Sequence, residues 1–377
     1  MMRQNKKALI IATIGGFLSV TEINNARLLQ KLGFEVHYAA NRKLRNYEFE
    51  EQELINMGIV LHQVDFSKNP FDFAKLGKCI KELKRLIDKE KFDVIHCHTP
   101  VGGVAGRMAA YISKIGKQSS PYIMYTAHGF HFYNGAPVLN WIIYYPVEYL
   151  LSCLTDCLVT INQEDYERAK RMLCKNCVQI PGVGIDLRRF CPSEKVYREK
   201  IGTEKFRIIS VGELNKNKNH SIVIQALALL QDKDITYEIY GNGPFKEALE
   251  ANIRHYGLET QVSLKGFHMH IEEVLLQADC CIFPSIREGL GLATLEAMAC
   301  KIPLIVSDNR GVREFAEHGK NCIVCQHNNA KQFAEAILHI KRDKVFAKGL
   351  TEYAYETVQK FSVQESTKVM RNVYEKI

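Results

Sequence analysis

The fold is decided by the stretch CCIFPSIREGLGLATLEAMA, residues 280–299. Its first residues form a short apolar run that ends at Pro284, and a loop with two glycines then leads into an apolar segment of helical period around Leu292. A buried strand joined by a short loop to a helix is the unit from which parallel sheets are assembled. The stretch therefore predicts an α/β fold, provided that the same unit recurs along the chain.

The strand–helix unit recurs in both halves of the chain, where helix-period segments such as 21–32 and 71–90 alternate with short β-branched and apolar runs. We expect strands at residues 8–12, 35–39, 60–64, 94–98, 122–126, 157–161, 207–211, 236–240, 262–264, 280–284, 304–307 and 322–324. This alternation predicts two doubly wound, Rossmann-like parallel-sheet domains. We place them at 1–183 and 184–360, joined near Pro181-Gly182-Val183-Gly184, with a C-terminal helix at 361–377 that packs back on the first domain.

Composition and charge exclude several classes of protein. A chain of 377 residues is long enough for two domains. Its composition, with 46% hydrophobic and 24% charged residues, excludes a disordered, collagenous or coiled-coil protein. Residues 1–190 hold 25 basic and 18 acidic residues, whereas residues 191–377 hold 25 and 24. This one-sided excess suggests an anionic surface or substrate, but it is too dilute for a nucleic-acid-binding arm. We expect no nucleic-acid partner.

The twelve cysteines are scattered along the chain, and we interpret most of them as buried free thiols in a reducing compartment. Those inside apolar runs are Cys97, Cys157, Cys280 and Cys281. Two CxxC pairs, Cys174/Cys177 and Cys322/Cys325, raise the possibility of a zinc site. The pairs are far apart in the sequence and the second lies in an expected strand, so we predict no metal site.

The N-terminus imitates a secretory signal peptide, because residues 1–7 are basic and residues 8–20 are apolar. No small-x-small cleavage site follows, and the run passes through Gly15-Gly16 into a helical pattern at Glu22, so a buried first strand explains it better. The apolar run 141–151 is interrupted by Pro146 and Glu148 and is too short to span a bilayer. We expect a soluble protein or one bound at a membrane surface.

Glycines follow the first expected strand, at Gly15 and Gly16. The full GxGxxG fingerprint is absent, and no carboxylate follows the second strand, which argues against a nicotinamide enzyme. Two glycines can let the backbone approach a phosphate or a sugar, although a structural turn explains them as well.

A lysine-rich loop follows the strand that ends at Val211, and it reads Gly212-Glu213-Leu214-Asn215-Lys216-Asn217-Lys218-Asn219-His220. A flexible lysine in this position could neutralise a diphosphate, and the alternative is a solvated basic loop.

The loop Glu288-Gly289-Leu290-Gly291 opens the helix around Leu292, and the free amides at such a helix start suit a phosphate. Glu288 lies in the loop, and Glu296 lies about one turn into the helix, where carboxylate oxygens can accept hydrogen bonds from sugar hydroxyls. Glu296 is embedded among small and apolar residues, so an unpaired surface carboxylate is a poor explanation of it.

These motifs together resemble the retaining family 4 glycosyltransferases of the two-domain GT-B fold, whose domains face each other across a cleft. Glu288-x7-Glu296 is similar to the family signature, and further similarities are Gly15-Gly16, the D-[VI]-[IV]-H-x-H strand ending at His98, Thr126-x-His128-Gly129, the linker Gly184-Ile185-Asp186 with Phe190-Cys191-Pro192, Gly212 with Lys218, and Gly241-x-Gly243-Pro244. The loops around His128 and Lys218 look most like bacterial exopolysaccharide and capsule transferases.

The resemblance implies a role for each matching residue. The first domain would bind the acceptor and the second the nucleotide sugar. Lys218 would hold the donor diphosphate with the amides near Gly291 and Leu292, Glu296 would bind the ribose, Glu288 the transferred sugar, and His128 would face that sugar near its anomeric carbon. The donor-binding set would then be Gly15, Gly16, Gly212, Lys218, Glu288, Gly289, Leu290, Gly291, Leu292 and Glu296, with His128, Lys218 and Glu288 in the catalytic role.

One position departs from the family pattern. Many members carry an arginine where this chain has Glu213, and a carboxylate cannot bind a diphosphate, so Lys218 would act with Lys216 or Arg287. The family implies front-face transfer with retention, in which Lys218 would make a divalent ion unnecessary. We expect no cofactor and no metal.

Residues 68–91 contain eight Lys/Arg and four Asp/Glu. An apolar stripe runs along this expected helix through Phe73, Leu76, Ile80, Leu83 and Ile87, and a basic face lies about 200° round from it at Lys75, Lys78, Arg85 and Lys89. One interpretation is a packing helix with a solvated face. The other is contact with an anionic membrane surface, which the basic front half and the aromatic run at 141–149 favour.

We therefore predict a retaining glycosyltransferase that moves a hexosyl or N-acetylhexosaminyl group from a nucleotide-diphosphate donor, a UDP-sugar, to a lipid-diphosphate-linked saccharide in cell-surface polysaccharide biosynthesis. It would work in the cytoplasm, peripherally on the inner face of the cell membrane. The alternatives are a UDP-N-acetylglucosamine 2-epimerase of the same architecture and a non-catalytic partner that binds a sugar nucleotide, which Glu213 would favour.

Overall fold

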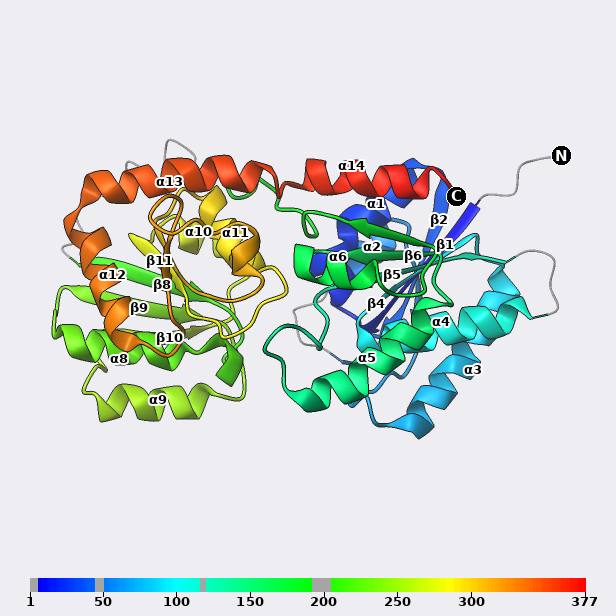
Figure 1. The fold of residues 1–377 in the computed structure, drawn as a ribbon, viewed down its shortest axis with the longest axis horizontal. Helices are drawn as coiled ribbons and strands as arrows, with labels where there is room; N and C mark the ends of the chain where they lie inside the picture. Colours follow the sequence, from blue (N-terminus) through cyan, green and yellow to red (C-terminus); the bar gives the residue numbers. More distant parts are fainter. Residues whose placement is uncertain (1–5, 45–50, 116–119, 192–204) are drawn as a thin grey trace. The chain divides into compact units, whose positions relative to one another are not determined.

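A computed structural model describes residues 6–44, 51–115, 120–191 and 205–377 of the chain. Contacts divide the chain into unit 1, Met1–Gly184 with Gln364–Ile377, and unit 2, Ile185–Val363 (Figure 1). Residues 1–5 of the basic N-terminal segment and Pro192 of the linker motif lie outside the described residues.

Unit 1 is built on a parallel sheet of order β3-β2-β1-β4-β5-β6-β7. Its strands are β1 (Lys6–Ile14), β2 (Phe34–Asn41), β3 (Val60–Gln63), β4 (Val94–His98), β5 (Tyr122–Ala127), β6 (Cys157–Thr160) and β7 (Asn176–Gln179). The strands expected in this half of the chain are confirmed, but β7 was missed. It is an edge strand with partly exposed, polar residues, so it lacks the apolar run that marks the others.

Helices cover both faces of this sheet. They are η1 (Leu18–Glu22, a π-helical turn), α1 (Ile23–Lys31), α2 (Glu51–Asn56), α3 (Phe73–Glu90), α4 (Pro100–Lys114), α5 (Val138–Ser152), α6 (Gln163–Ala169) and α14 (Val363–Tyr374). On one face, α3, α4 and α5 lie side by side (Figure 1) and bury alternate strand residues such as Leu9 and Ile11. The other face carries His96, whose Nδ1 lies 2.8 Å from the Tyr374 hydroxyl of α14.

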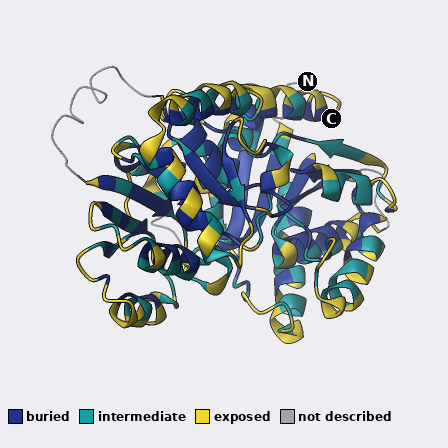
Figure 2. Ribbon diagram, turned by 60° about the vertical axis from the view of Figure 1, so that its left-hand side comes forward, coloured by how far each residue is buried: buried dark blue, intermediate teal, exposed yellow. Residues whose placement is uncertain are grey.

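Unit 2 repeats the architecture with the parallel order β10-β9-β8-β11-β12-β13. Its strands are β8 (Phe206–Val211), β9 (Ile235–Tyr240), β10 (Val262–Gly266), β11 (Cys280–Phe283), β12 (Leu304–Ser307) and β13 (Ile323–Cys325). Its helices are η2 (Lys216–Lys218), α8 (His220–Leu230), α9 (Lys246–His255), α10 (Ile271–Leu275), α11 (Leu292–Ala299), η3 (Val312–Glu314), α12 (Ala330–Arg342) and α13 (Lys344–Gln359). Figure 2 shows that the central strands are buried while the helices carry exposed residues. The prediction of two doubly wound parallel-sheet domains is confirmed.

The apolar stripe expected on α3 is only partly buried. Leu83 and Ile87 belong to the core, but Phe73 at the start of the helix is 71% exposed. The cations of the opposite face are all exposed, namely Lys75, Lys78, Arg85 and Lys89. None of the described helices is long and apolar enough to cross a membrane.

A buried ion pair links three elements of unit 1. The Arg107 guanidinium of α4 donates to the Glu148 carboxylate of α5 at 2.8 Å, and the Tyr125 hydroxyl of β5 donates to the same carboxylate at 3.3 Å. The guanidinium also lies 4.0 Å from the centre of the Tyr125 ring. Because both charged groups are removed from water, loss of one partner leaves the other uncompensated.

We expect Glu148→Ala to lower the free energy of unfolding of unit 1 by about 3–5 kcal/mol, because it leaves Arg107 buried without its counter-ion. Urea unfolding followed by fluorescence of Trp141, the single tryptophan of the chain, measures it, since this residue packs against the core of unit 1. Glu167→Ala is the matched control, because the Lys170–Glu167 pair is exposed and its loss should change the free energy of unfolding little. Equal effects of the two substitutions would contradict the importance of the buried pair.

Candidate active site

The predicted site residues gather where the strand order reverses. In unit 1 this point lies between β1 and β4, and in unit 2 between β8 and β11. Ligands of doubly wound sheets bind outside the carboxyl ends of the strands at this point. Gly15 and Gly16 follow β1, Gly212 and Lys218 follow β8, and other predicted residues follow β5 and β11, namely His128 and the 288–292 loop.

In unit 2, the structure brings Lys218 and Glu288 together. Lys218 Nζ lies 2.6 Å from Glu288 Oε1, although the two residues are far apart in the sequence. Both side chains keep some exposure, 24% and 18%, so the pair can be reached from solvent. A cation and a carboxylate side by side suit a ligand that presents an anionic group next to hydroxyls.

Gly212 lies beneath the stem of Lys218. A Cβ atom added at Gly212 would lie 3.1 Å from Lys218 Cε and 3.2 Å from its Cδ. The absence of a side chain at this position therefore makes room for the lysine.

Three asparagines fix the Lys218 loop, one by a bond within the loop and two by bonds to neighbouring segments. Asn215 Oδ1 accepts from the Lys218 amide at 2.9 Å. Asn217 donates to the Arg287 carbonyl at 2.9 Å, and its own carbonyl accepts from the Ile286 amide at 2.8 Å. Asn219, in the left-handed conformation at φ 55°, donates to the Pro284 and His327 carbonyls at 3.2 and 2.7 Å.

These asparagines were missed as functional residues in the sequence. The signal that could have found them is the alternation of asparagine at every second position of the loop, since asparagine both tolerates left-handed backbone and bonds to neighbouring main chain.

The Glu288 loop is shaped by glycines. Gly291 adopts φ +91° at the start of α11, a conformation that favours glycine. Gly311 packs against the loop so closely that a Cβ atom there would lie 2.8 Å from the Glu288 carbonyl oxygen. Gly311 was also missed, because its role depends on a loop that follows a different strand.

Glu296 lies on α11 and is half-buried. None of the described residues forms a hydrogen bond with its carboxylate. Burial raises the pKa of Glu296 to about 7, with Glu272 raising it further and Arg189 and Lys218 opposing the rise. Such a carboxyl group is open to hydrogen bonds from a ligand.

Glu213 is exposed, and its carboxylate accepts from the Asn215 side chain at 3.0 Å. The same Asn215 side chain accepts from the Lys218 amide. Glu213 is therefore connected to the lysine through one asparagine.

In unit 1, His128 belongs to a cluster that the sequence analysis did not assign. Its Nε2 lies 3.2 Å from His98 Nδ1 and 3.4 Å from Glu22 Oε1. Strand alternation explains part of the cluster, because His96 and His98 of β4 share one face of the sheet. The neighbouring strand β5 places Thr126 beside His98, and His128 follows this strand directly. The signal available in the sequence was the H-x-H spacing, whereas nothing singled out Glu22.

Gly15 and Gly16 are buried and lead into η1, which carries Glu22. The Gly15 amide donates to the Asn41 carbonyl of β2 at 3.1 Å. Their first function is therefore to turn the chain from β1 into this π-helical segment.

Glu22, His96 and His98 form the one group among the described residues whose ligand atoms lie close enough together to suggest a metal ion, within 4.8 Å of one another. Both ring nitrogens of His96 are already engaged, with the Tyr374 hydroxyl at 2.8 Å and the Thr126 hydroxyl at 2.7 Å. The arrangement fits a hydrogen-bond network better than a metal centre.

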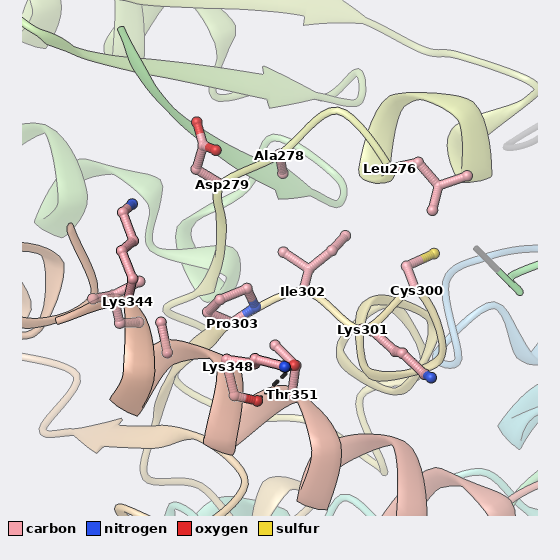
Figure 3. A pocket seen from close by; sticks show the side chains of 12 residues that line it. Leu276, Ala278, Asp279, Cys300, Lys301, Ile302, Pro303, Lys344, Lys348 and Thr351 are labelled. Carbon is pink, nitrogen blue, oxygen red and sulfur yellow. Dashed lines mark hydrogen bonds between the residues drawn. The ribbon is translucent and has the colours of Figure 1, made fainter. Parts of the chain in front are cut away.

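A cavity of about 240 Å³ opens elsewhere in unit 2 (Figure 3). It lies beside Asp279 and Pro303, which precede β11 and β12, and the helical residues that line it include Lys344, Lys348 and Thr351. It is therefore at the opposite end of these strands from Glu288, and none of the predicted donor-binding residues lines it.

Two family models match the chain. Residues 193–357 match the model of glycosyl transferases group 1, and residues 11–162 match that of glycosyl transferase 4-like proteins. A Bacillus subtilis relative named putative glycosyltransferase EpsD is 34% identical over 98% of this chain and 96% of its own length. The chain belongs to the group 1 glycosyltransferases.

Other relatives of this glycosyltransferase are more distant. An Escherichia coli protein named UDP-Gal:alpha-D-GlcNAc-diphosphoundecaprenol alpha-1,3-galactosyltransferase is 28% identical over 71% of each chain. The crystal structure of Anabaena HepE in complex with UDP and glucose has a TM-score of 0.80 at 18% identity and covers 99% of this chain and 100% of its own. Sucrose-phosphate synthase from Thermosynechococcus elongatus has a TM-score of 0.81 at 19% identity, with 99% of both chains covered. These likenesses confirm the GT-B fold.

The raised pKa of Glu296 predicts a pH-dependent stability of the glycosyltransferase. Its ordinary value is 4.5 and its folded value about 7, so the stabilising contribution present below pH 4.5 is lost as the pH rises through 7. Glu296→Gln keeps the neutral form, and we expect it to raise the thermal midpoint of unfolding at pH 8 while leaving the midpoint at pH 4 unchanged.

Calorimetry at the two pH values measures this difference. Glu335→Gln is the control, because Glu335 is an exposed glutamate of α12 in the same unit and its replacement should shift neither midpoint by much. A lower midpoint for Glu296→Gln at pH 8 would show that the ionised carboxylate stabilises the fold.

Proposed function

We propose that this glycosyltransferase moves a sugar, with retention, from a UDP-sugar to a lipid-diphosphate-linked saccharide in the synthesis of a cell-surface polysaccharide. The observation that carries the proposal is the contact between Lys218 and Glu288 at the carboxyl ends of β8 and β11. The names of the relatives support its parts, since HepE binds UDP and glucose and the E. coli relative acts on a diphosphoundecaprenol-linked sugar.

Lys218 neutralises the donor diphosphate and the charge that develops on it as the sugar leaves. The amides of the loop Gly289–Leu292 at the start of α11 add donors to the same phosphates. Glu288, next to the lysine, accepts hydrogen bonds from the transferred sugar, and Glu296 accepts from the ribose. The family resemblance assigns His128 the role of a hydrogen-bond partner of the sugar.

In the transfer step, the bond between the anomeric carbon and the phosphate oxygen breaks, and a bond from the same carbon to the acceptor oxygen forms on the same face. The proton of the acceptor hydroxyl passes to the leaving diphosphate. We infer this course from the family resemblance. Transfer on the same face requires no second carboxylate placed to form a covalent intermediate. Lys218 supplies the positive charge that a resident metal ion would otherwise supply.

Neither alternative has comparable support. Both matching family models describe transferases and not epimerases. The exposed position of Glu213, bonded to Asn215, leaves Lys218 free to pair with Glu288 and so weakens the case for a non-catalytic partner.

We expect Lys218→Met to raise the Kd for UDP about tenfold to a hundredfold, because a hydrogen bond to a charged group contributes about 1.5–3 kcal/mol. Isothermal titration with UDP measures it. Lys216→Met removes an exposed lysine from the same loop and should change the Kd by about threefold or less. Equal Kd values for the two variants would remove Lys218 from the donor site.

Turnover is tested by UDP release from a panel of UDP-sugars with a membrane lipid extract as acceptor, for the wild type and Glu288→Ala. The proposal predicts acceptor-dependent release from one sugar, abolished in the variant. UDP binding without release from any sugar would favour the non-catalytic partner.

A lipid-linked acceptor requires access to a membrane, and unit 1 has a suitable surface. Along α5, four apolar side chains are more than 60% exposed: Val138, Leu139, Ile142 and Leu150. The exposed cations of α3 lie on the same side of the sheet, because α4 packs between the two helices (Figure 1). We propose that α5 enters the interface of the inner leaflet while α3 contacts anionic head groups, which would make the enzyme a peripheral protein of the cytoplasmic membrane face.

Charge reversal at Lys75, Lys78, Arg85 and Lys89 should weaken binding to phosphatidylglycerol vesicles about a hundredfold or more, since each cation near the surface contributes about 1 kcal/mol. Vesicle sedimentation at low and high salt measures it, and binding by α5 should persist at high salt. Lys331→Glu with Lys348→Glu is the control, because both lysines are exposed in unit 2. Unchanged binding after the fourfold reversal would exclude α3 from the membrane surface.

A further inference from the structure

A buried carboxyl group and a buried imidazole lie directly behind His128. The Glu22 and His98 side chains have no exposed surface, whereas His128 keeps 19% exposure. Within this cluster, Glu22 Oε1 lies 3.4 Å from His128 Nε2 and 3.6 Å from His98 Nδ1. His128 is therefore the one member of the three that a ligand can reach, and its Nε2 side faces the other two.

The second carboxyl oxygen of Glu22 is already occupied. Its Oε2 accepts from the Asn25 side chain at 2.6 Å, while Oε1 is buried without a hydrogen bond of normal length. A buried oxygen of this kind is costly unless it carries a proton and donates, or accepts from a neighbour. The polar atoms beside it are the two imidazole nitrogens, so its state is coupled to theirs.

The surroundings of Glu22 favour its protonated, uncharged form. Burial raises the pKa of Glu22 to about 8, although the hydrogen bond from Asn25 opposes the rise. Burial lowers the pKa of His128 to about 4 and holds that of His98 well below its ordinary value. The other titratable groups around the cluster are His96, Tyr38 and Tyr374, and they are neutral near pH 7 as well.

The backbone next to His98 is unusual. Thr99 follows at φ +62°, which is rare for a β-branched residue, and its hydroxyl bonds to Thr13 at the end of β1 at 2.7 Å. Such strained residues persist where the surrounding structure holds them in place. The ends of β1 and β4 are thus tied together where Glu22 and His98 meet.

We propose that Glu22 and His98 are positioning residues that present a hydrogen-bond donor to Nε2 of His128 and so place the His128 proton on Nδ1, the nitrogen left for the sugar. A neutral imidazole has one donor and one acceptor nitrogen, and the partner of one nitrogen decides the role of the other. His128 then meets the transferred sugar as a hydrogen-bond donor and not as a base. This assignment of the sugar contact rests on the proposed function.

The tautomer can be read by nitrogen-15 NMR of histidine-labelled protein, with the His128 signals assigned by their loss in His128→Gln. In the wild type at pH 7 we expect Nδ1 protonated and Nε2 unprotonated. Glu22→Gln should keep this tautomer, because the amide oxygen can accept from Asn25 while the amide NH₂ donates to Nε2. Glu22→Ala removes the carboxyl donor and leaves only His98 Nδ1 beside Nε2, so part of the His128 population should shift toward the other tautomer. His37, which contacts Glu35 and His62, is an internal control whose signals should not move.

Kinetics give the second readout. Glu22→Ala should lower kcat about tenfold or more, as loss of a tautomer-fixing side chain does in hydrolytic triads, while Glu22→Gln should restore most of it. A wild-type His128 protonated on Nε2 would overturn the proposal, as would an unchanged tautomer in Glu22→Ala. If Glu22→Ala does not fold, the wild type and Glu22→Gln still decide the question. Because the tautomer is measured without substrate, a failure of the proposed transfer reaction would be seen separately, as absence of UDP release from the wild type.

Discussion

The pairing of parallel strands on both sides of β1 and of β8 is the constraint on which both units depend. Parallel neighbours require a crossover of a dozen or more residues, so each strand returns to the same edge of the sheet after a helix. Where the strand order reverses, the helices leave to opposite faces and the loops at that edge are left open. Lys218 meets Glu288 for this reason, and in unit 1 the same reversal brings Glu22, His98 and His128 together.

The two units bury ionisable groups in two ways, as an ion pair or as a single carboxyl group. Arg107 and Glu148 are buried as a pair, so they stabilise the packing of α4 on α5. Glu22 and Glu296, by contrast, form no ion pair with a lysine or arginine among the described residues, and burial raises the pKa of each. A carboxyl group held in this way is costly to the fold, and such costs are characteristic of sites that bind or transform a ligand. Each follows a loop at the carboxyl end of a strand of its own sheet.

Much of the architecture could be predicted from local patterns. The runs around Ile10, Ile95 and Ile282 are apolar because their strands are buried on both faces, and periodicity alone located them. Prediction failed where burial is partial. The edge strand β7 has no apolar run, and Phe73 continues the stripe of α3 beyond the point where the helix meets the core. At the site, Glu288 and Lys218 could be selected from their motifs, but the supporting Gly311 and Glu22 could not, and Asn217 was missed although asparagine recurs at every second position of its loop.

By itself the sequence determined most of the strands and helices and the two-unit organisation, because these follow from the spacing of apolar residues along the chain, and its motifs carried the resemblance to the family. Only the tertiary structure decided which side chains meet. The contact of Lys218 with Glu288, the packing of Gly311 on the Glu288 loop and the position of Glu22 behind His128 each join segments that follow different strands. The physical reason is that strand order within a sheet, and not distance along the chain, sets which loops are neighbours.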